Sequence, residues 1–171
     1  MAHVDTWEGG TNATHLDFIY NVTMAVGPPG TAPNRPDDVM LVQYLLKTIV
    51  RVGLWVPPTL SKPFPADGRM GPDTAAWIQD YQLTKHRVAV QDGRIDRALG
   101  VNASLAHRVY TIIFLNNDFQ TATLLRTGSL DWYNALEDDV DAPAELRRAI
   151  RVSRAAGSAG LPWDSPGLAE Q

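Results

Sequence analysis

Apolar residues recur at three- and four-residue steps from Val39 to Val50, the spacing that gathers side chains on one face of a helix. Pro36-Asp37-Asp38 fits the start of such a helix, because proline suits the first turn and carboxylates are favourable near the positive end of the helix dipole. Gly53 and Pro57-Pro58 stop the pattern. The sequence therefore predicts one well-bounded amphipathic helix here.

Two further helices are predicted downstream. Pro72-Asp73-Thr74 repeats the proline and acidic start, and Trp77 and Tyr81 belong to the apolar face that follows. A third helical region is expected from about Leu105 to Leu115, with Ser104 as its N-cap. That region is rich in β-branched residues, so a strand is the alternative.

The two ends of the chain have different patterns. His15 to Val26 alternates apolar residues and predicts a β-like segment, which the glycine and proline cluster of Gly27 to Pro33 separates from the first helix. The apolar pattern weakens after Asn116 to Asp118. A short helix is then predicted from about Asp141 to Arg154, and Gly157 to Gln171 has the composition of a tail or docking arm.

The expected fold is mainly α, with a three-helix core between two extensions. The core spans residues 35–118, the N-terminal extension with its β-like segment spans 1–34, the C-terminal helical extension spans 119–156 and the tail spans 157–171. A chain of 171 residues has room for one compact domain with such additions, but not for two large ones.

Composition narrows the function classes. A net charge of −4 gives no reason to expect nucleic acid or anionic lipid as the main partner. The absence of cysteine excludes disulfides and thiolate chemistry. The first ten residues lack the basic and apolar regions of a Sec signal peptide, and the longest apolar run, Tyr110 to Leu115, is far below the ~20 residues of a membrane-spanning helix. A soluble protein is expected.

One short motif occurs twice. Asp67-Gly68-Arg69-Met70 and Asp92-Gly93-Arg94-Ile95 each combine an Asp-Gly turn with an arginine and a large apolar residue. Aspartate accepts backbone hydrogen bonds in such a turn, and glycine tolerates a positive φ. Two similar turns are therefore predicted, one before and one after the second helix.

These turns and the helices around them resemble the peptidoglycan-binding domain family over about residues 35–116. The family pattern is a helix with valine or leucine and glutamine, then Asp-Gly-x-x-Gly-x-x-Thr, an aromatic-glutamine pair and a second Asp-Gly. The matching residues are Val39, Gln43, Leu46, Asp67, Gly68, Gly71, Thr74, Ile78, Tyr81, Gln82, Asp92 and Gly93. The loop from Trp55 to Ala66 is longer than in the family, and Ile95-Asp96 follows the second turn without the usual Gly-x-x-Thr.

The resemblance implies a non-catalytic peptidoglycan-binding or cell-wall attachment module. Sugars stack on aromatic rings and need oriented polar groups, so Trp77 and Tyr81 are the candidate ligand-binding aromatics, with Asp67, Arg69 and Asp73 around them. The alternative is that Trp77 and Tyr81 are core residues and Asp67 a turn residue.

A second hypothesis is a structural or adaptor subunit that reuses the fold and binds another protein. The two chain ends favour it, and Arg147, Arg151 and Arg154 form a positive face on the terminal helix that suits an acidic partner. Either protein would belong to a phage particle, a contractile injection machine or the cargo of a secretion system, and would lie in the bacterial cytoplasm before assembly or export.

An enzyme is the least favoured interpretation. Glu8-Gly9-Gly10 resembles the catalytic motif of phage-type muramidases, but too few residues precede Glu8 to form the helix that carries it there. The four histidines have no ligand spacing, so no metal is predicted. No glycine-rich phosphate loop occurs, and no cofactor is expected.

Overall fold

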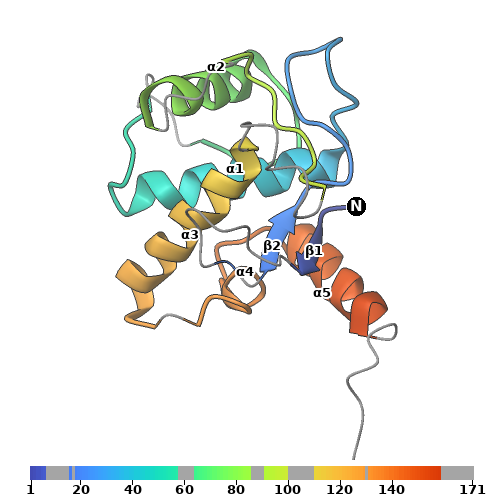
Figure 1. The fold of residues 1–171 in the computed structure, drawn as a ribbon, viewed down its shortest axis with the longest axis vertical. Coiled ribbons are helices and arrows are strands. Elements are labelled where there is room, and N and C mark those ends of the chain that lie inside the picture. Colours follow the sequence, from blue (N-terminus) through green and yellow to red (C-terminus); the bar gives the residue numbers. More distant parts are fainter. Residues whose placement is uncertain are drawn as a thin grey trace, which may run out of the picture.

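The computed structural model describes residues 1–6, 16, 18–57, 64–85, 91–99, 110–129 and 131–158, and it is mainly helical with a two-stranded sheet (Figure 1). The elements are β1 (His3–Thr6), β2 (Phe18–Asn21), α1 (Pro36–Arg51), α2 (Pro72–Asp80), the π-helix η1 (Tyr81–Lys85), α3 (Thr111–Thr127), α4 (Ala135–Asp138) and α5 (Ala144–Ser158). This confirms the predicted fold class, including the small β extension at the N-terminal end.

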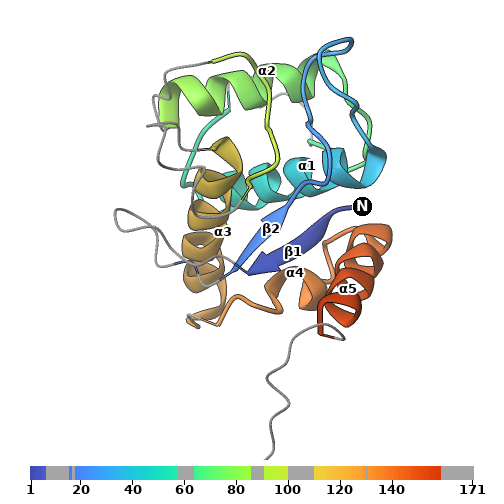
Figure 2. The same ribbon diagram turned by 45° about the vertical axis from the view of Figure 1, so that its right-hand side comes forward.

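The first two helices begin where the sequence predicts. α1 and α2 each have proline in the first turn, and the apolar residues that define their faces, including Val39, Leu46 and Ile78, are completely buried. α3 crosses α1 in front of it, and α2 lies above both (Figures 1 and 2). The three helices therefore surround a shared apolar centre.

α3 is longer than predicted. The sequence predicts the end of the core at residue 118, but the helix continues to Thr127. The apolar pattern fades because polar residues occupy the buried face: Asn116 is 0% exposed and Asp118 is 6% exposed. Each has an internal hydrogen-bond partner, which removes most of the cost of burial. The predicted boundary at 118 therefore falls in the middle of a helix.

The small sheet is closed at both edges by side chains. β1 and β2 are antiparallel, with Val4 opposite Tyr20. On the β2 edge, the side-chain amide of Asn116 accepts from the Tyr20 N–H at 2.7 Å and donates to its carbonyl at 2.9 Å. On the β1 edge, the Val4 N–H donates to the Ser153 hydroxyl at 3.2 Å. Strand addition at these positions would have to displace α3 or α5.

The C-terminal part of the chain packs on the same core. α5 contacts both β1 and α1, and Leu146 and Ile150 join the apolar cluster that also contains Tyr20. Tyr20 is fully buried, and its hydroxyl donates to the carbonyl of Tyr133 at 2.9 Å. The sheet therefore lies between the helical core and the α4–α5 region, as Figure 2 shows.

The glycine and proline cluster after β2 is packed against the core. Val26 and Ile95 form an isolated antiparallel bridge with N···O distances of 2.9 and 2.7 Å. The Arg94 guanidinium donates to the carbonyl of Thr31 at 2.6 Å. The segment that separates the β-like segment from the first helix is thus tied to the second Asp-Gly turn.

Candidate functional site

The first Asp-Gly turn is held by a buried glutamine of α1. The Gln43 side-chain nitrogen donates to Thr74 Oγ1 at 3.1 Å, to the Arg69 carbonyl at 3.1 Å and to Asp67 Oδ1 at 3.2 Å. Its oxygen accepts from the Gly68 N–H at 2.8 Å. We call this group the first latch, and it joins α1, the turn and the start of α2.

The second Asp-Gly turn is held in the same way by Gln82 of η1. The Gln82 nitrogen donates to the Arg94 carbonyl at 2.9 Å and to Thr111 Oγ1 at 3.1 Å, and it lies 3.5 Å from Asp92 Oδ1. Its oxygen accepts from the Gly93 N–H at 3.0 Å. This second latch joins η1, the turn and the start of α3.

Sequence reasoning missed Thr111 as the threonine of the second latch. Thr74 follows its aspartate by 7 positions, whereas Thr111 follows Asp92 by 19, so the expected spacing is absent. The two threonines are nonetheless equivalent in space, because each hydroxyl accepts from the nitrogen of its glutamine at 3.1 Å. A search for threonine at the start of the next helix, instead of at fixed spacing, would have found it.

Both turns also approach the start of the preceding helix. Gly68 has φ +73°, and a Cβ placed there would lie 2.6 Å from the carbonyl oxygen of Pro36 in α1. Gly93 has φ +68°, and its Cβ would lie 3.3 Å from the carbonyl oxygen of Ala75 in α2. Only glycine meets the backbone angle and the close contact together at Gly68.

Two of the five predicted ligand-binding residues are buried. Trp77 is 4% exposed, with its ring stacked on Phe64 at 3.8 Å and edge-on to Trp55 at 5.5 Å. Tyr81 is 0% exposed, and its hydroxyl donates to Asp118 Oδ2 at 2.7 Å. Neither ring offers a face to a ligand in this conformation, so ligand binding at this surface would depend on other residues.

The other three predicted ligand-binding residues are exposed. Asp67 and Arg69 lie in the first turn and Asp73 in the first turn of α2. Asp67 Oδ1 accepts from the Arg69 N–H at 2.9 Å and also from the Gln43 side-chain nitrogen. The structure therefore brings a guanidinium and two carboxylates to one end of α2.

Two buried tyrosines bind carboxylates next to cations. Burial raises the pKa of Tyr81, and the charge and hydrogen bond of Asp118 raise it further. Lys85 Nζ lies 3.9 Å from Asp118 Oδ1. Tyr44 donates to Asp139 Oδ2 at 2.7 Å, and burial followed by this bond likewise raises the Tyr44 pKa. Both phenols therefore stay protonated donors that fix α3 and its surroundings.

Asp139 combines this bond with an ion pair. Arg126 donates to Asp139 Oδ2 at 2.6 Å. Burial alone would raise the pKa of Asp139, but the hydrogen bonds from Arg126 and Tyr44 outweigh it and hold the pKa below the ordinary value of 3.8. The carboxylate is therefore charged and joins α1 to the end of α3.

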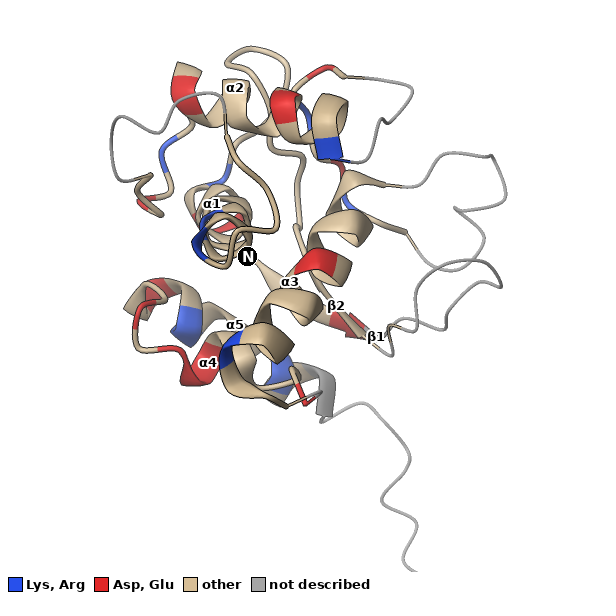
Figure 3. Ribbon diagram, turned by 90° about the vertical axis from the view of Figure 1, so that its left-hand side faces the viewer, with Lys and Arg blue, Asp and Glu red and all other residues tan. Residues whose placement is uncertain are grey.

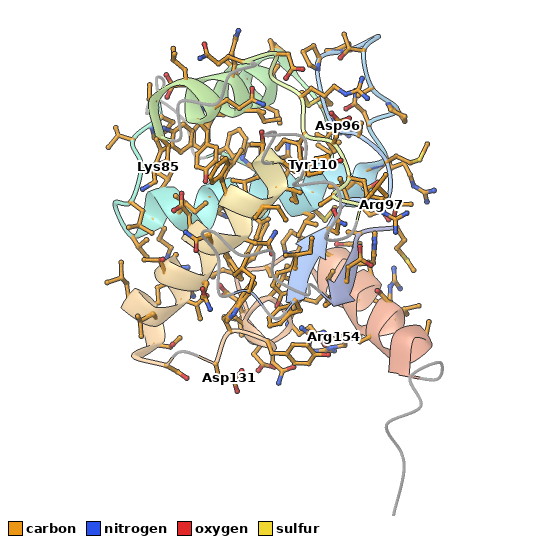
Figure 4. All side chains as sticks on the ribbon, in the orientation of Figure 1. Lys85, Asp96, Arg97, Tyr110, Asp131 and Arg154 are labelled. Carbon is orange, nitrogen blue, oxygen red and sulfur yellow. The ribbon has the colours of Figure 1, made fainter. Side chains whose placement is uncertain are left out.

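The predicted partner-binding arginines differ in their exposure. Arg154 contacts Glu137 and lies 3.8 Å from the centre of the Tyr133 ring, and its side chain is 11% exposed. Arg151 lies 3.5 Å from the same carboxylate but is 60% exposed. Arg147 is half-buried. Figure 4 shows Arg154 on the side of α5 that faces the α4 region, so Arg154 holds α4 to α5.

A polar cluster lies at one end of the sheet. His3 Nε2 is 3.0 Å from Asp5 Oδ2, and the Asn21 side chain donates to that oxygen at 2.7 Å. Arg97 approaches it at 3.9 Å and lies beside the strands in Figure 4. Burial would raise the pKa of Asp5, but the hydrogen bonds from His3 and Asn21 bring it below the ordinary value. The cluster fixes the loop around Arg97 to the sheet.

No metal cluster is found in the part of the chain that the structure describes. Among those residues, no three His, Cys, Asp or Glu side chains are placed to hold a metal ion. Glu8, the residue of the muramidase hypothesis, lies outside the described residues, as does the predicted cap Ser104. Within the described part of the chain, no helix has the length and hydropathy needed to cross a membrane.

Comparison of the chain with protein-family models, curated proteins and solved structures gave no match. The resemblance to the peptidoglycan-binding domain family therefore rests on the motif residues alone and stays a prediction.

Proposed function

We propose that this protein is a non-catalytic adaptor or structural subunit that binds an acidic surface of a partner protein through the arginine side of α5. The helical core with its two latches would be the scaffold that presents this side. Such a subunit would act in a bacterial assembly, such as a phage particle or an injection machine, after synthesis in the cytoplasm.

The observation that carries the proposal is the charge of α5 in an acidic protein. α5 contains four arginines, Arg147, Arg148, Arg151 and Arg154, and one glutamate, Glu145. Across from it, the single carboxylate of Glu137 contacts both Arg151 and Arg154. Figure 3 shows basic residues on α5 beside acidic ones of the α4 region. Arg148 and the exposed part of Arg151 leave positive charge at the surface, which favours an acidic partner.

The residues that carry the family resemblance support a scaffold role. Gln43 and Gln82 are 1% and 2% exposed, and both use their side-chain amides within the chain. Trp77 and Tyr81 belong to the apolar core. The contacts that these residues make within the chain are therefore enough to explain their presence without a bound glycan.

Peptidoglycan binding is the second candidate, because Asp67, Arg69 and Asp73 are exposed together at one end of α2. Cell-wall peptides carry both carboxylates and amines, which these side chains could pair with. Such a site would recognise the peptide part of the polymer, since the two predicted aromatic rings are buried.

The decisive experiment compares charge reversals on two helices. A partner is captured from a lysate of the source cells with the full chain, identified by mass spectrometry, purified and titrated against three proteins. The proposal predicts that Arg148→Glu/Arg151→Glu weakens the Kd at least about tenfold. Lys47→Glu, an exposed charge reversal on α1, should leave the Kd within about twofold. Equal binding by all three would contradict the proposal.

A parallel assay addresses the second candidate. The chain is sedimented with purified insoluble peptidoglycan, beside Arg69→Ala and Asp73→Ala variants. Retention that these two substitutions abolish, while the α5 double variant is retained normally, would replace the adaptor interpretation by cell-wall binding.

A further inference from the structure

Two arginines of α5 contact the carboxylate of Glu137, but they are held very differently. Arg154 is 11% exposed; besides Glu137 it contacts Asn134 Oδ1 at 2.6 Å, and it lies 3.8 Å from the centre of the Tyr133 ring. Arg151 is 60% exposed, with Nε 3.5 Å from Glu137 Oε2 and Nη2 donating to the Glu137 carbonyl at 3.3 Å. Arg154 is therefore fixed by several groups, whereas Arg151 is held through two long contacts to Glu137.

Glu137 is held in place more firmly than Arg151. Its side chain is 12% exposed, and its neighbour Leu136 is fully buried in the core. α4 contacts α5, and Figure 3 shows the acidic α4 region beside the basic residues of α5. An ion pair at the surface changes an equilibrium by about fivefold or less, because side-chain entropy and water oppose it. Arg151 can therefore turn toward solvent easily, while the carboxylate stays where it is.

Arg148 differs from Arg151 in having no such contact. It is exposed, and it makes no ion pair with another described residue. It precedes Arg151 by three positions, so the two side chains lie on the same side of α5. An acidic group can therefore pair with Arg148 without breaking an existing contact, whereas at Arg151 it has to replace Glu137.

We infer that Glu137 competes with acidic partners for Arg151, and so lowers the affinity of the arginine side of α5. This inference rests on the proposed function, because it concerns the same site. A carboxylate that reaches only Arg151 exchanges one ion pair for another, whereas a carboxylate that reaches Arg148 forms a new one. The site therefore favours partners whose acidic groups meet Arg148 first.

Fluorescence anisotropy of a fluorescein-labelled hexaglutamate peptide tests this competition with the full chain. The titrations are done at about 20 mM salt, where exposed charges are weakly screened. Glu137→Gln frees Arg151 and should strengthen the Kd about three- to fivefold. Asp138→Asn is the matched control, since it removes an exposed carboxylate next to Glu137 in the chain, and it should change the Kd by less than about 1.5-fold.

Single arginine variants test the same competition without altering Glu137. In the otherwise wild-type chain, Arg148→Met should weaken the Kd at least about twofold more than Arg151→Met, because Arg151 is already paired. In the Glu137→Gln chain the two losses should become equal. A Glu137 that only holds α4 to α5 would not change the ratio of these losses.

Circular dichroism first establishes that each variant is folded, which is expected for Glu137→Gln because Arg154 keeps its contacts to Asn134 and Tyr133. Arginine-dependent peptide binding that Glu137→Gln leaves unchanged would overturn this inference alone. So would equal losses for Arg148→Met and Arg151→Met in the wild-type chain, which decide the question even if Glu137→Gln does not fold. Peptide binding that Arg148→Glu/Arg151→Glu does not weaken, or no binding, would overturn the proposed function as well.

Discussion

The two latches use the same chemistry over different lengths of chain. In both, a glutamine amide accepts from a glycine N–H and donates to the carbonyl of the arginine that follows this glycine and to a threonine hydroxyl. The first turn is tied mainly by Gln43, whereas the second is also held by the Val26–Ile95 bridge and by Arg94. The same hydrogen-bonded turn therefore forms when a much longer segment separates its aspartate from the threonine, provided that other contacts hold the turn in place.

The largest difference between the latches is expected at their glycines. Gly68→Ala should cost about 3 kcal/mol of unfolding free energy, because a positive φ is combined with a Cβ only 2.6 Å from a backbone oxygen. Gly93→Ala should cost about 1 to 2 kcal/mol, since its nearest atom is 3.3 Å away. Urea unfolding of both variants measures this difference.

Gly128→Ala separates the backbone cost from the steric cost. Gly128 has φ +72°, and no atom of the described residues beyond its chain neighbours lies within 4 Å of its Cβ position, so Gly128→Ala should cost about 1 kcal/mol. Equal losses for Gly68→Ala and Gly128→Ala would show that the close approach to Pro36 contributes nothing.

Replacing the glutamines with alanine should also reduce the free energy of unfolding more at the first latch than at the second. Gln43→Ala leaves the buried Gly68 N–H and Thr74 hydroxyl without this partner, and we expect a loss of about 2 to 3 kcal/mol. Gln82→Ala should cost about 1 to 2 kcal/mol, because the second turn keeps its other tethers. Thermal and urea unfolding provide the comparison.

Gln79→Ala is the control for the glutamine series, since Gln79 is exposed and its side-chain amide donates to the Gln91 carbonyl. Its effect should stay within about 0.5 kcal/mol. A larger loss for Gln82→Ala than for Gln43→Ala would reverse the proposed order of the two latches.

A smaller effect on stability, which depends on pH, is expected at the charged contact between α1 and α3 and not at the neutral latches. The pKa of Asp139 is depressed in the fold, so its stabilising contribution is present above the ordinary pKa of 3.8 and is lost as pH falls through the folded value. Asp139→Asn should therefore cost about 1 kcal/mol at pH 7. That cost should shrink below about pH 4, and unfolding of both proteins from pH 7 to pH 3 measures it.

The Gln43→Ala loss, by contrast, should change little over this range, because the amide's partners at Gly68, Arg69 and Thr74 are neutral groups. A constant Asp139→Asn cost at every pH would contradict the charged contact.

The sequence was sufficient for the parts of the fold that local chemistry determines. Proline with acidic residues places the starts of α1 and α2, and the two Asp-Gly motifs form turns with positive-φ glycines. The burial of Val39, Leu46 and Ile78 follows from helical periodicity. These features depend on a few neighbouring residues, so one sequence contains their signal.

The remainder depends on long-range contacts. The length of α3 was underestimated because Asn116 and Asp118 are polar yet buried against partners far away in the sequence. The sequence leaves both roles of Trp77 open for a similar reason, since an aromatic residue on an apolar face suits a core or a ligand site equally well until its neighbours are known. Arg151 and Arg154 both contact Glu137 only because α4 packs on α5, and the sequence alone does not reveal this packing.

If the repeated motif residues serve the scaffold, amide hydrogen exchange at Gly68 and Gly93 should be slow. Both N–H groups are buried and donate to a glutamine oxygen, at 2.8 and 3.0 Å. Both amides are expected to exchange only with global or near-global unfolding, with Gly68 the slower of the two. Exchange at the rate of an open surface turn would contradict this scaffold role.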